Sequence, residues 1–329
     1  MCFCTCPESL MARGFAFIEI IYTFVANNKR KPMTIIQLEY LLAVANYGSF
    51  SIAAEHCFVT QPSLSMQIKS LESELDVILL DRSKKPVVPT EAGEVVLAQA
   101  REALREYNSI KEVVLQFKGE IAGKIRLGII PTIAPYILHK FLPEFVLRYP
   151  KVELEIREMH TEQIVEQMNR DLIDVALVAG GTCGDEFTEY DLFDDRFYAY
   201  VSPQNSLYKK SNIQISDIDM RELVLLSQGN CLRDQVLELC QSRSMYPSRY
   251  YFESGSLETL MRIVDCTNSI TIIPEMAVEY VSKERSRQVK SLLRGAYSRK
   301  IALAVRRTYV KSSIVETLHK TILDCLGKK

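Results

Sequence analysis

The feature that most constrains the fold is the alternation of short apolar strands with helices from Lys124 onward. Alternation of these two element types is typical of an α/β fold, in which helices cover a sheet. We expect helices at 136–149 and 161–170, and strands at 125–130, 152–158, 175–179, 197–202, 223–227, 269–273 and 300–305.

Length and composition leave the function open. A chain of 329 residues suits two domains of ordinary size, or three small ones. Its net charge of −1 gives no global electrostatic argument for nucleic acid or membrane. Nine scattered cysteines, an odd number without a secretory signal, favour a reducing, cytoplasmic compartment. No pattern indicates a cofactor or a metal.

The first 32 residues differ from the rest. Cys2, Cys4 and Cys6 alternate but lack further ligands at metal-binding spacing. The apolar run at 14–26 is too short to span a membrane and has no cleavage site after it. Because a clean amphipathic pattern begins at Met33, we expect residues 1–32 to be a disordered leader or a wrongly assigned start. Amino-terminal sequencing of the native protein tests this.

Residues 33–92 show three helices at helix-turn-helix spacing. Apolar residues predict helices over 37–47 and 49–58, the first ending at Gly48. Val59 and Thr60 form a tight turn, after which Thr60 caps a third helix whose inner face carries Leu64, Ile68, Leu71 and Leu75. This geometry alone is compatible with any small helical bundle as well as with a DNA-binding motif.

The particular residues of this region, beyond their helical spacing, help to decide between a small helical bundle and a DNA-binding motif. Ser-Phe-Ser-Ile-Ala-Ala-Glu-His at 49–56, the continuation to Leu75, and Val-Pro-Thr-Glu-Ala-Gly at 88–93 resemble the winged helix-turn-helix of LysR-type transcriptional regulators. Asp76 replaces a common Gly at an expected left-handed helix end, which Asp tolerates moderately. Leu80 replaces a frequent Phe. Neither departure puts the expected binding of double-stranded promoter DNA in doubt.

Residues 33–92 carry four Lys or Arg and seven Asp or Glu, a balance of −3 that is unexpected for a phosphate-binding surface. Hydroxyl groups and helix amino termini can hold phosphates instead, aided by a few cations. Glutamines are plausible readers of adenine edges. The expected DNA-binding residues are Ser51, Thr60, Gln61, Pro62, Ser63, Ser65, Gln67, Arg82, Lys84 and Lys85.

A heptad seam follows at 93–122. Its apolar positions alternate spacings of four and three over three repeats, which is typical of a dimerising coiled coil. The alternative is a helix packed on its own domain. In LysR-type regulators the corresponding linker helix dimerises, so we expect a homodimer or homotetramer. The seam comprises Val96, Ala100, Ala103, Tyr107, Ile110, Val114 and Phe117.

The same resemblance implies a two-lobed regulatory domain over 123–329, like a periplasmic binding protein. The chain would cross between lobes near Asp194 and return near Arg299. Lobe I then covers 123–194 and 299–329, and lobe II covers 195–298.

Two cysteines nine positions apart, Cys231 and Cys240, occupy a short amphipathic segment after Gly229. In a helix their Cα atoms lie about 13 Å apart on opposite faces. A disulfide requires Cα atoms within roughly 7 Å, so this pair can bridge only if the helix unwinds. The duller alternative is that both are small core residues. At Cys231, the helix start and nearby Arg233 favour thiolate.

Four stretches resemble the OxyR group of peroxide-sensing LysR-type regulators: 128–136, 158–161, 229–240 and 252–260. The resemblance implies that Cys231 is the peroxidatic cysteine and Cys240 the resolving one. It further implies a peroxide site formed by Thr132, Thr161, Asn230, Arg233, Asp234 and Arg306. Asn230 departs from the pattern, since a His often stands there, and Asn cannot titrate near neutrality.

The resulting expectation is a non-enzymatic activator that senses hydrogen peroxide, controls oxidative-stress genes with RNA polymerase, and is recycled by a thiol reductant. Two alternatives stay open. A small organic effector between the lobes would leave Cys240 dispensable, and a thiol peroxidase would show multiple turnover.

Overall fold

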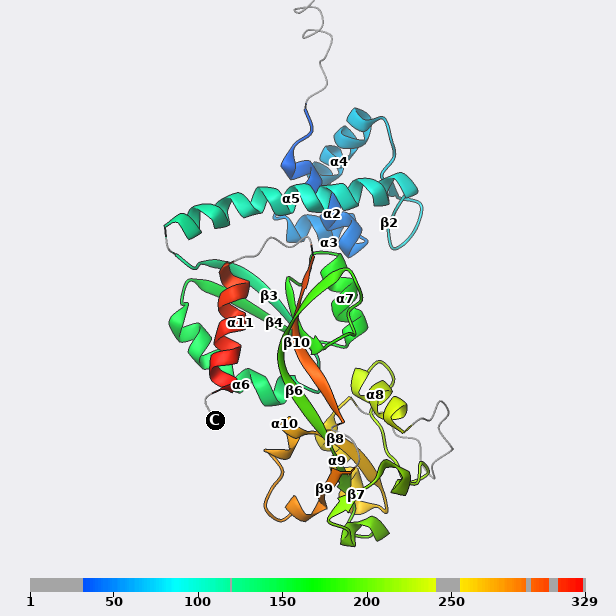
Figure 1. Ribbon diagram of the computed structural model, residues 1–329. Coiled ribbons are helices and arrows are strands. Elements are labelled where there is room, and N and C mark those ends of the chain that lie inside the picture. Colours follow the sequence, from blue (N-terminus) through cyan, green and yellow to red (C-terminus); the bar gives the residue numbers. More distant parts are fainter. Residues whose placement is uncertain (1–31, 119, 241–254, 294–296, 308–312, 328–329) are drawn as a thin grey trace, which may run out of the picture. The chain divides into compact units, whose positions relative to one another are not determined.

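The computed structural model describes residues 32–118, 120–240, 255–293, 297–307 and 313–327 (Figure 1). Interresidue contacts divide the chain into two units, one ending at Tyr107 and the other starting at Asn108. Among the described residues, no helix combines the length and apolar character needed to cross a bilayer.

The amino-terminal unit is a winged helix-turn-helix, as expected. Thr34 and Gln37 form a capping box, and Ser49 caps the second helix through the Ile52 amide. Between these helices Gly48 adopts a left-handed conformation, and a Cβ there would meet Pro86 Cβ at 2.6 Å. The elements are α2 (Ile35–Tyr47), α3 (Phe50–His56), α4 (Gln61–Leu75), β1 (Leu80–Asp81), β2 (Val88–Pro89) and the start of α5 (Glu91–Phe117).

The wing is fixed to α5 by a short polar motif. The Thr90 hydroxyl donates to Ile78 O at 2.7 Å and accepts from the Gly93 amide at 3.0 Å. A Cβ at Gly93 would lie 2.0 Å from Leu79 O, so only glycine allows this approach. Asp76 ends α4 with φ 54°, which confirms the expected left-handed helix end.

Most of the predicted core of this unit is buried, with one exception. Leu64, Ile68 and Leu71 are fully buried. Leu75 was expected on the same face but is 39% exposed. It is the last residue of α4, where the chain turns away at Asp76 and the core no longer covers it.

The carboxy-terminal unit is a mixed α/β fold around one continuous run of strands. The strand order is β4-β3-β5-β10-β6-β9-β7, and β8 pairs with β6. β3 runs parallel to β4 and β5, whereas β10 is antiparallel to β5 and β6. The strands are β3 (Gly123–Ile129), β4 (Val152–Glu158), β5 (Val175–Ala179), β6 (Phe187–Val201), β7 (Asn212–Ile213), β8 (Ile270–Pro274), β9 (Val289–Leu292) and β10 (Ser298–Arg306).

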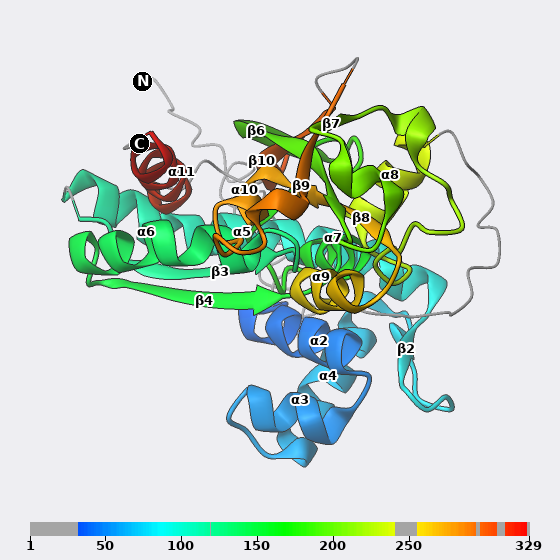
Figure 2. The same ribbon diagram turned by 90° about the horizontal axis from the view of Figure 1, so that it is seen from below.

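Helices cover this sheet on its faces and ends. α6 and α11 lie side by side, and β3 and β4 run together in both views (Figures 1 and 2). Pro143 lies within α6, yet the helix continues to Arg148. The helices are α6 (Ala134–Arg148), α7 (Thr161–Asn169), α8 (Cys231–Leu239), α9 (Leu257–Cys266), α10 (Glu275–Val278) and α11 (Ser313–Leu326).

β6 connects the two halves of this unit. Its first part pairs with β10 and its last five residues pair with β8 and β9. Sequence analysis placed the strand start at 197, ten residues late. The first part carries acidic side chains, such as Asp191 bonded to Lys300, which hide its strand pattern.

The prediction of a strand at 223–227 is wrong. Only Leu223 forms an isolated bridge, with Ile270, and Val224 donates its amide to Ile270 O. Residues 223–226 are nevertheless 2–9% exposed. The apolar run reflects burial beside β8 without a ladder of its own, an ambiguity inherent in short apolar runs.

Candidate functional site

The two cysteines of the 227–240 segment lie at opposite ends of α8. Cys231 is its first residue, and Cys240 is its carboxy-terminal cap. The expected helix is therefore confirmed, and the helical rise again separates the two Cα atoms by about 13 Å. Both thiols are free, as no disulfide joins the described cysteines. The structure thus has the arrangement in which a direct bridge cannot form.

Burial dominates the chemistry of Cys231. It raises the pKa of the thiol, whereas Arg299, the Thr161 hydroxyl and the Leu232 amide lower it. The expectation that local groups favour thiolate is thus wrong for the net direction, because desolvation outweighs the helix start. Arg299, from a strand 68 positions later, also lowers the pKa of Cys231, a cation that sequence analysis did not propose.

Arg299 belongs to a fully buried polar network. Its guanidinium donates to Asp195 Oδ2 at 3.0 and 3.1 Å, and the two side chains are 1% and 0% exposed. A second arm donates to Thr132 Oγ1 at 3.0 Å. The Met276 amide completes the network by donating to Asp195 Oδ1 at 3.1 Å. Such a pair is held rigidly, because losing either partner leaves a buried charge uncompensated.

The two predicted threonines have different roles in this geometry. Thr132 is 1% exposed, and both its hydroxyl and its carbonyl accept bonds from Arg299. Thr161, the first residue of α7, lies close enough to Cys231 to lower its pKa. Its Oγ1 is nonetheless buried, and no described residue gives it full hydrogen-bond geometry.

The remaining predicted peroxide-site residues hold the loop before α8, lie in the first turn of α8, or lie near the end of α7. Asn230 is buried and its amide donates to Ser227 O and Oγ at 3.3 and 3.2 Å. Arg233 donates to Leu226 O at 2.8 Å, which holds the loop before α8. Asp234 is exposed in the first turn of α8 and raises the pKa of Cys231.

Arg306 was expected near the thiol, but its bonds hold the end of α7. It donates to Asn169 Oδ1 at 2.7 Å and lies 3.9 Å from Asp171. Sequence analysis chose it as the cation after the last strand. Arg299, which lowers the pKa of Cys231, stands seven positions earlier on β10.

Cys240 has a plainer environment than Cys231. Burial alone raises the pKa of its thiol. It packs, half-buried, against the main apolar core. This agrees with the expectation that it stays unreactive while α8 is folded.

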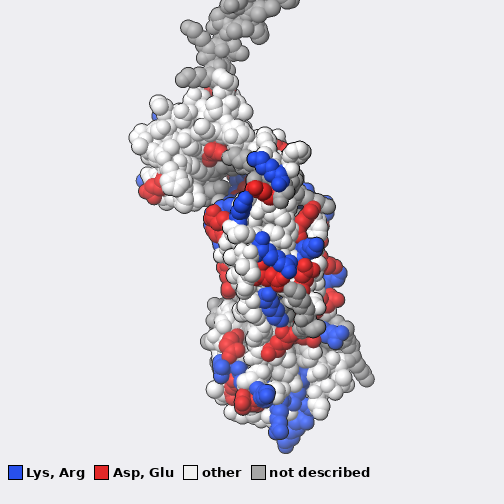
Figure 3. All heavy atoms as spheres, turned by 90° about the vertical axis from the view of Figure 1, so that its left-hand side faces the viewer, with Lys and Arg blue, Asp and Glu red and all other residues white. Residues whose placement is uncertain are grey.

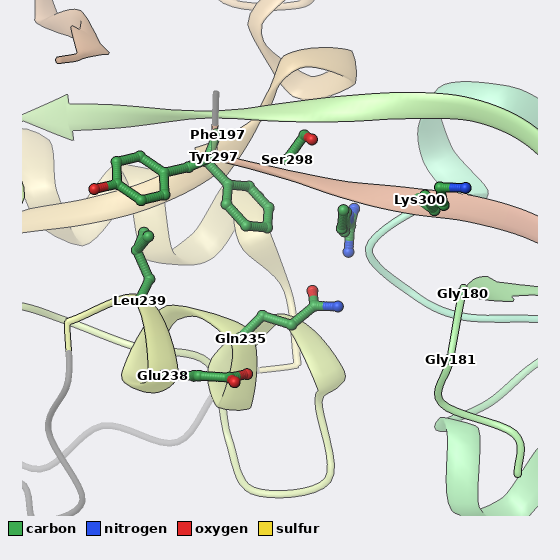
Figure 4. A pocket seen from close by; sticks show the side chains of 10 residues that line it. Gly180, Gly181, Phe197, Gln235, Glu238, Leu239, Tyr297, Ser298 and Lys300 are labelled. Atoms are coloured by element: carbon green, nitrogen blue, oxygen red, sulfur yellow. The ribbon is translucent and has the colours of Figure 1, made fainter. Parts of the chain in front are cut away.

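A cavity of about 570 Å³ lies along one face of α8. Gln235, Glu238 and Leu239 form its α8 wall, and Gly180 and Gly181 lie opposite (Figure 4). Figure 4 shows Gln235 extending from the helix into this space. The remaining wall comes from the crossing strands, namely Phe197, Tyr297, Ser298, Arg299 and Lys300.

The predicted DNA surface is mostly exposed. On the face in Figure 3, the helix-turn-helix carries few charged side chains. The Thr60 side chain makes no capping bond to α4, so its hydroxyl is available for phosphate. All ten predicted members are exposed or partly exposed, namely Ser51, Thr60, Gln61, Pro62, Ser63, Ser65, Gln67, Arg82, Lys84 and Lys85.

Arg82 and Gln67, which were predicted to contact DNA, also form contacts within the helix-turn-helix. Arg82 donates to Glu72 at 2.7 Å and lies over the Phe50 ring at 5.0 Å. Gln67 accepts from the Gln37 side chain at 3.3 Å and is partly buried. Both side chains thus stabilise the motif in this structure. Helical periodicity alone does not distinguish this role from contact with DNA.

The predicted seam on α5 divides into two parts. Val96 and Ala100 pack on the core of the helix-turn-helix, which fits the alternative of a helix packed on its own domain. Ala103 is exposed, and further along the apolar seam stays uncovered. Tyr107, Ile110, Val114 and Phe117 are 43%, 61%, 48% and 95% exposed.

Comparisons with known proteins agree with this architecture. Residues 35–94 match the bacterial regulatory helix-turn-helix protein, lysR family, and residues 118–326 match the LysR substrate binding domain. A hydrogen peroxide-inducible genes activator from Haemophilus influenzae is 35% identical over 246 residues, 75% of this chain and 81% of that protein. The DNA-binding transcriptional dual regulator OxyR of Escherichia coli is also 35% identical, with 80% of its length covered.

Solved structures give the same result. A full-length OxyR variant from Pseudomonas aeruginosa aligns with a TM-score of 0.75 and 30% identity, covering 89% of this chain and 95% of that one. A peroxide-bound OxyR mutant from Corynebacterium glutamicum aligns with a TM-score of 0.56 and 27% identity, covering 91% and 94%. The chain therefore belongs to the LysR family of transcriptional regulators and, within it, to the OxyR group of peroxide-responsive regulators.

Proposed function

We propose that this protein is a DNA-binding regulator that senses hydrogen peroxide through reversible formation of a Cys231–Cys240 disulfide. The observation that carries the proposal is the site around Cys231. A half-buried thiol at the start of α8 lies beside a fixed guanidinium, Arg299, and a buried hydroxyl, Thr161, that lacks a full partner. Sulfur, cation and hydroxyl are the groups that peroxide reduction requires.

The first step is attack of the Cys231 thiolate on one peroxide oxygen. A sulfur–oxygen bond forms, the oxygen–oxygen bond breaks, and the second oxygen leaves as hydroxide, which takes up a proton to become water. Arg299 and the Thr161 hydroxyl stabilise the negative charge that develops on the leaving oxygen. Thr132 acts through Arg299, whose orientation it fixes.

The second step requires α8 to unwind. Leu232 and Val236 are 2% and 1% exposed, and burying each side chain stabilises the folded state by about 1.5–3 kcal/mol. Breaking this packing opposes the change until Cys240 condenses with the sulfenic acid and releases water. The disulfide then holds the segment in a new packing, which converts oxidation into a change of shape.

The change of shape acts on promoter DNA through the helix-turn-helix. The uncovered part of the α5 seam supports pairing with a second copy, giving a homodimer or homotetramer. With few cations in each DNA-binding module, two modules on one site supply the affinity that one lacks. RNA polymerase is the partner for activation, a cellular thiol reductant reverses the disulfide, and the site of action is the cytoplasm.

The experiment is oxidation of the reduced protein with one equivalent of hydrogen peroxide, followed by disulfide mapping by mass spectrometry. We expect a Cys231–Cys240 bridge, and none after Cys231→Ser. Cys266→Ser, at an exposed cysteine of α9, is the matched control and should bridge normally. Free thiols at both positions would favour a small organic effector. Multiple turnover with a thiol reductant would favour a thiol peroxidase.

A further inference from the structure

A third cysteine lies at the edge of the sheet that holds the peroxide site. β4, β3 and β5 are parallel neighbours, so the segments that follow them meet at one edge. Thr161 follows β4, Thr132 follows β3, and Cys183 follows β5. The first two act on Cys231, directly or through Arg299. Cys183 is the corresponding residue of the third segment.

The surroundings of Cys183 place it against α8. Gly180 and Gly181, at the start of its loop, form one wall of the cavity whose other wall is α8 (Figure 4). On α8, Gln235 and Glu238 line that cavity, and they follow Cys231 by four and seven positions. Residues at these spacings share one face of a helix, so Cys231 begins the face that is turned toward the Cys183 loop.

Burial and charge distinguish the two thiols. Cys183 is 6% exposed, and burial raises its pKa to about 12, with smaller rises from Glu189 and Cys231. Cys183 belongs to the main apolar core, and Cys231 packs against that core. Cys183 stays protonated at neutral pH and does not compete with Cys231 for peroxide, because the thiolate is the nucleophile.

We propose that Cys183 is a second resolving thiol, which captures the sulfenic acid of Cys231 while α8 is still folded. This inference rests on the proposed peroxide chemistry of Cys231. Cys240 can reach Cys231 only after α8 unwinds, whereas Cys183 approaches from the opposite wall without that change. The Cys183–Cys231 disulfide links lobe I to lobe II, unlike the bridge to Cys240, which lies within lobe II.

The step balances without a further reactant. The Cys183 thiol passes its proton to the departing hydroxyl group as its sulfur attacks the Cys231 sulfur. A sulfur–sulfur bond forms, and the sulfur–oxygen bond of the sulfenic acid breaks. The hydroxyl group departs as water. The two electrons lost by the pair of cysteines were accepted by hydrogen peroxide in the preceding step.

The test uses the full-length Cys240→Ser variant, oxidised with one equivalent of hydrogen peroxide. Disulfides are mapped by mass spectrometry, and sulfenic acid is trapped with dimedone. We expect a Cys183–Cys231 bridge and little trapped sulfenic acid. Adding Cys183→Ala should abolish the bridge and raise dimedone labelling of Cys231 at least fivefold. Adding Cys266→Ser instead should change neither readout.

The outcomes separate this inference from the proposed function. Persistent sulfenic acid in Cys240→Ser, with Cys183 still reduced, overturns the role of Cys183 and leaves peroxide sensing intact. Absence of sulfenic acid and of any bridge at Cys231 in every variant overturns the peroxide chemistry itself. The decisive measurement is made in Cys240→Ser, so it does not depend on the folding of a Cys183 variant.

Discussion

The helix-turn-helix and the proposed peroxide site are built from residues at very different separations in the chain. The helix-turn-helix uses residues close in the chain, such as the Ser49 cap, the left-handed Gly48 and the Thr90 motif. The proposed peroxide site joins Thr132 to Arg299, 167 positions away, and Arg299 to Asp195, 104 positions away. A local motif has local sequence signals, whereas a site assembled by the sheet depends on strand pairing.

The largest effect should follow from breaking the buried pair of the distant site. Asp195→Ala leaves the Arg299 charge uncompensated, which costs about 3–5 kcal/mol of unfolding free energy. Urea denaturation measures the loss. The exposed pair Arg221–Asp219 is the matched control, and Arg221→Ala should leave the midpoint unchanged.

A double variant sharpens this prediction. Replacing Arg299 with Met as well as Asp195 with Ala removes both charges, so the double variant should be more stable than Asp195→Ala alone. A double variant that is less stable than either single change would show that the network stabilises the fold in a way that charge pairing does not explain.

The fold was largely predictable because most of its elements carry their own pattern. β4 and β5 were predicted at their observed bounds, and α8 was expected where it lies. The first part of β6 was missed because acidic residues such as Asp191 and Asp194 interrupt its apolar pattern, and only pairing with β10 reveals the strand. The prediction of a strand at 223–227 was wrong for the converse reason, because these apolar residues are buried without forming a ladder of β-sheet hydrogen bonds.

The candidate site was predictable only in part. Both cysteines and both threonines came from the family resemblance. In the structure Thr161 lies close to Cys231, and Thr132 binds Arg299, while their roles toward peroxide stay predictions. Arg299 was missed, since no spacing rule connects Cys231 to a strand 68 residues later. One signal was available: Asp195 and Arg299 flank the expected crossing points between lobes, where a buried charge needs a partner.

The pH dependence of oxidation tests the burial of Cys231. Burial raises the pKa of its thiol, and only the thiolate reacts, so the rate should increase about tenfold per pH unit between about pH 6 and 8.5. A peptide of residues 227–240 should level off near pH 8.5, the ordinary cysteine value. Stopped-flow oxidation under excess peroxide gives both profiles. A plateau of the intact protein below pH 8 would contradict the assigned burial.

Thr161→Val should have a smaller effect on the same rate. The change keeps the side-chain shape and removes the hydroxyl beside Cys231, so about 1 kcal/mol of stabilisation is lost and oxidation slows roughly fivefold. Thr188→Val, on the outer part of β6, is the control and should react at the parent rate. Equal rates for the two variants would remove Thr161 from the reaction.

The smallest effect concerns the local region. Asp76 ends α4 with φ 54°, a conformation that costs a residue with a Cβ about 1 kcal/mol relative to glycine. Asp76→Gly should therefore raise the unfolding free energy by up to about 1 kcal/mol, less the entropy that glycine adds to the unfolded chain. Gly48→Ala should instead lower the unfolding free energy, since it adds a Cβ at φ 63° and 2.6 Å from Pro86 Cβ. Thermal unfolding of both variants should move in opposite directions, and a shift in the same direction would show that backbone conformation is not what sets stability at these helix ends.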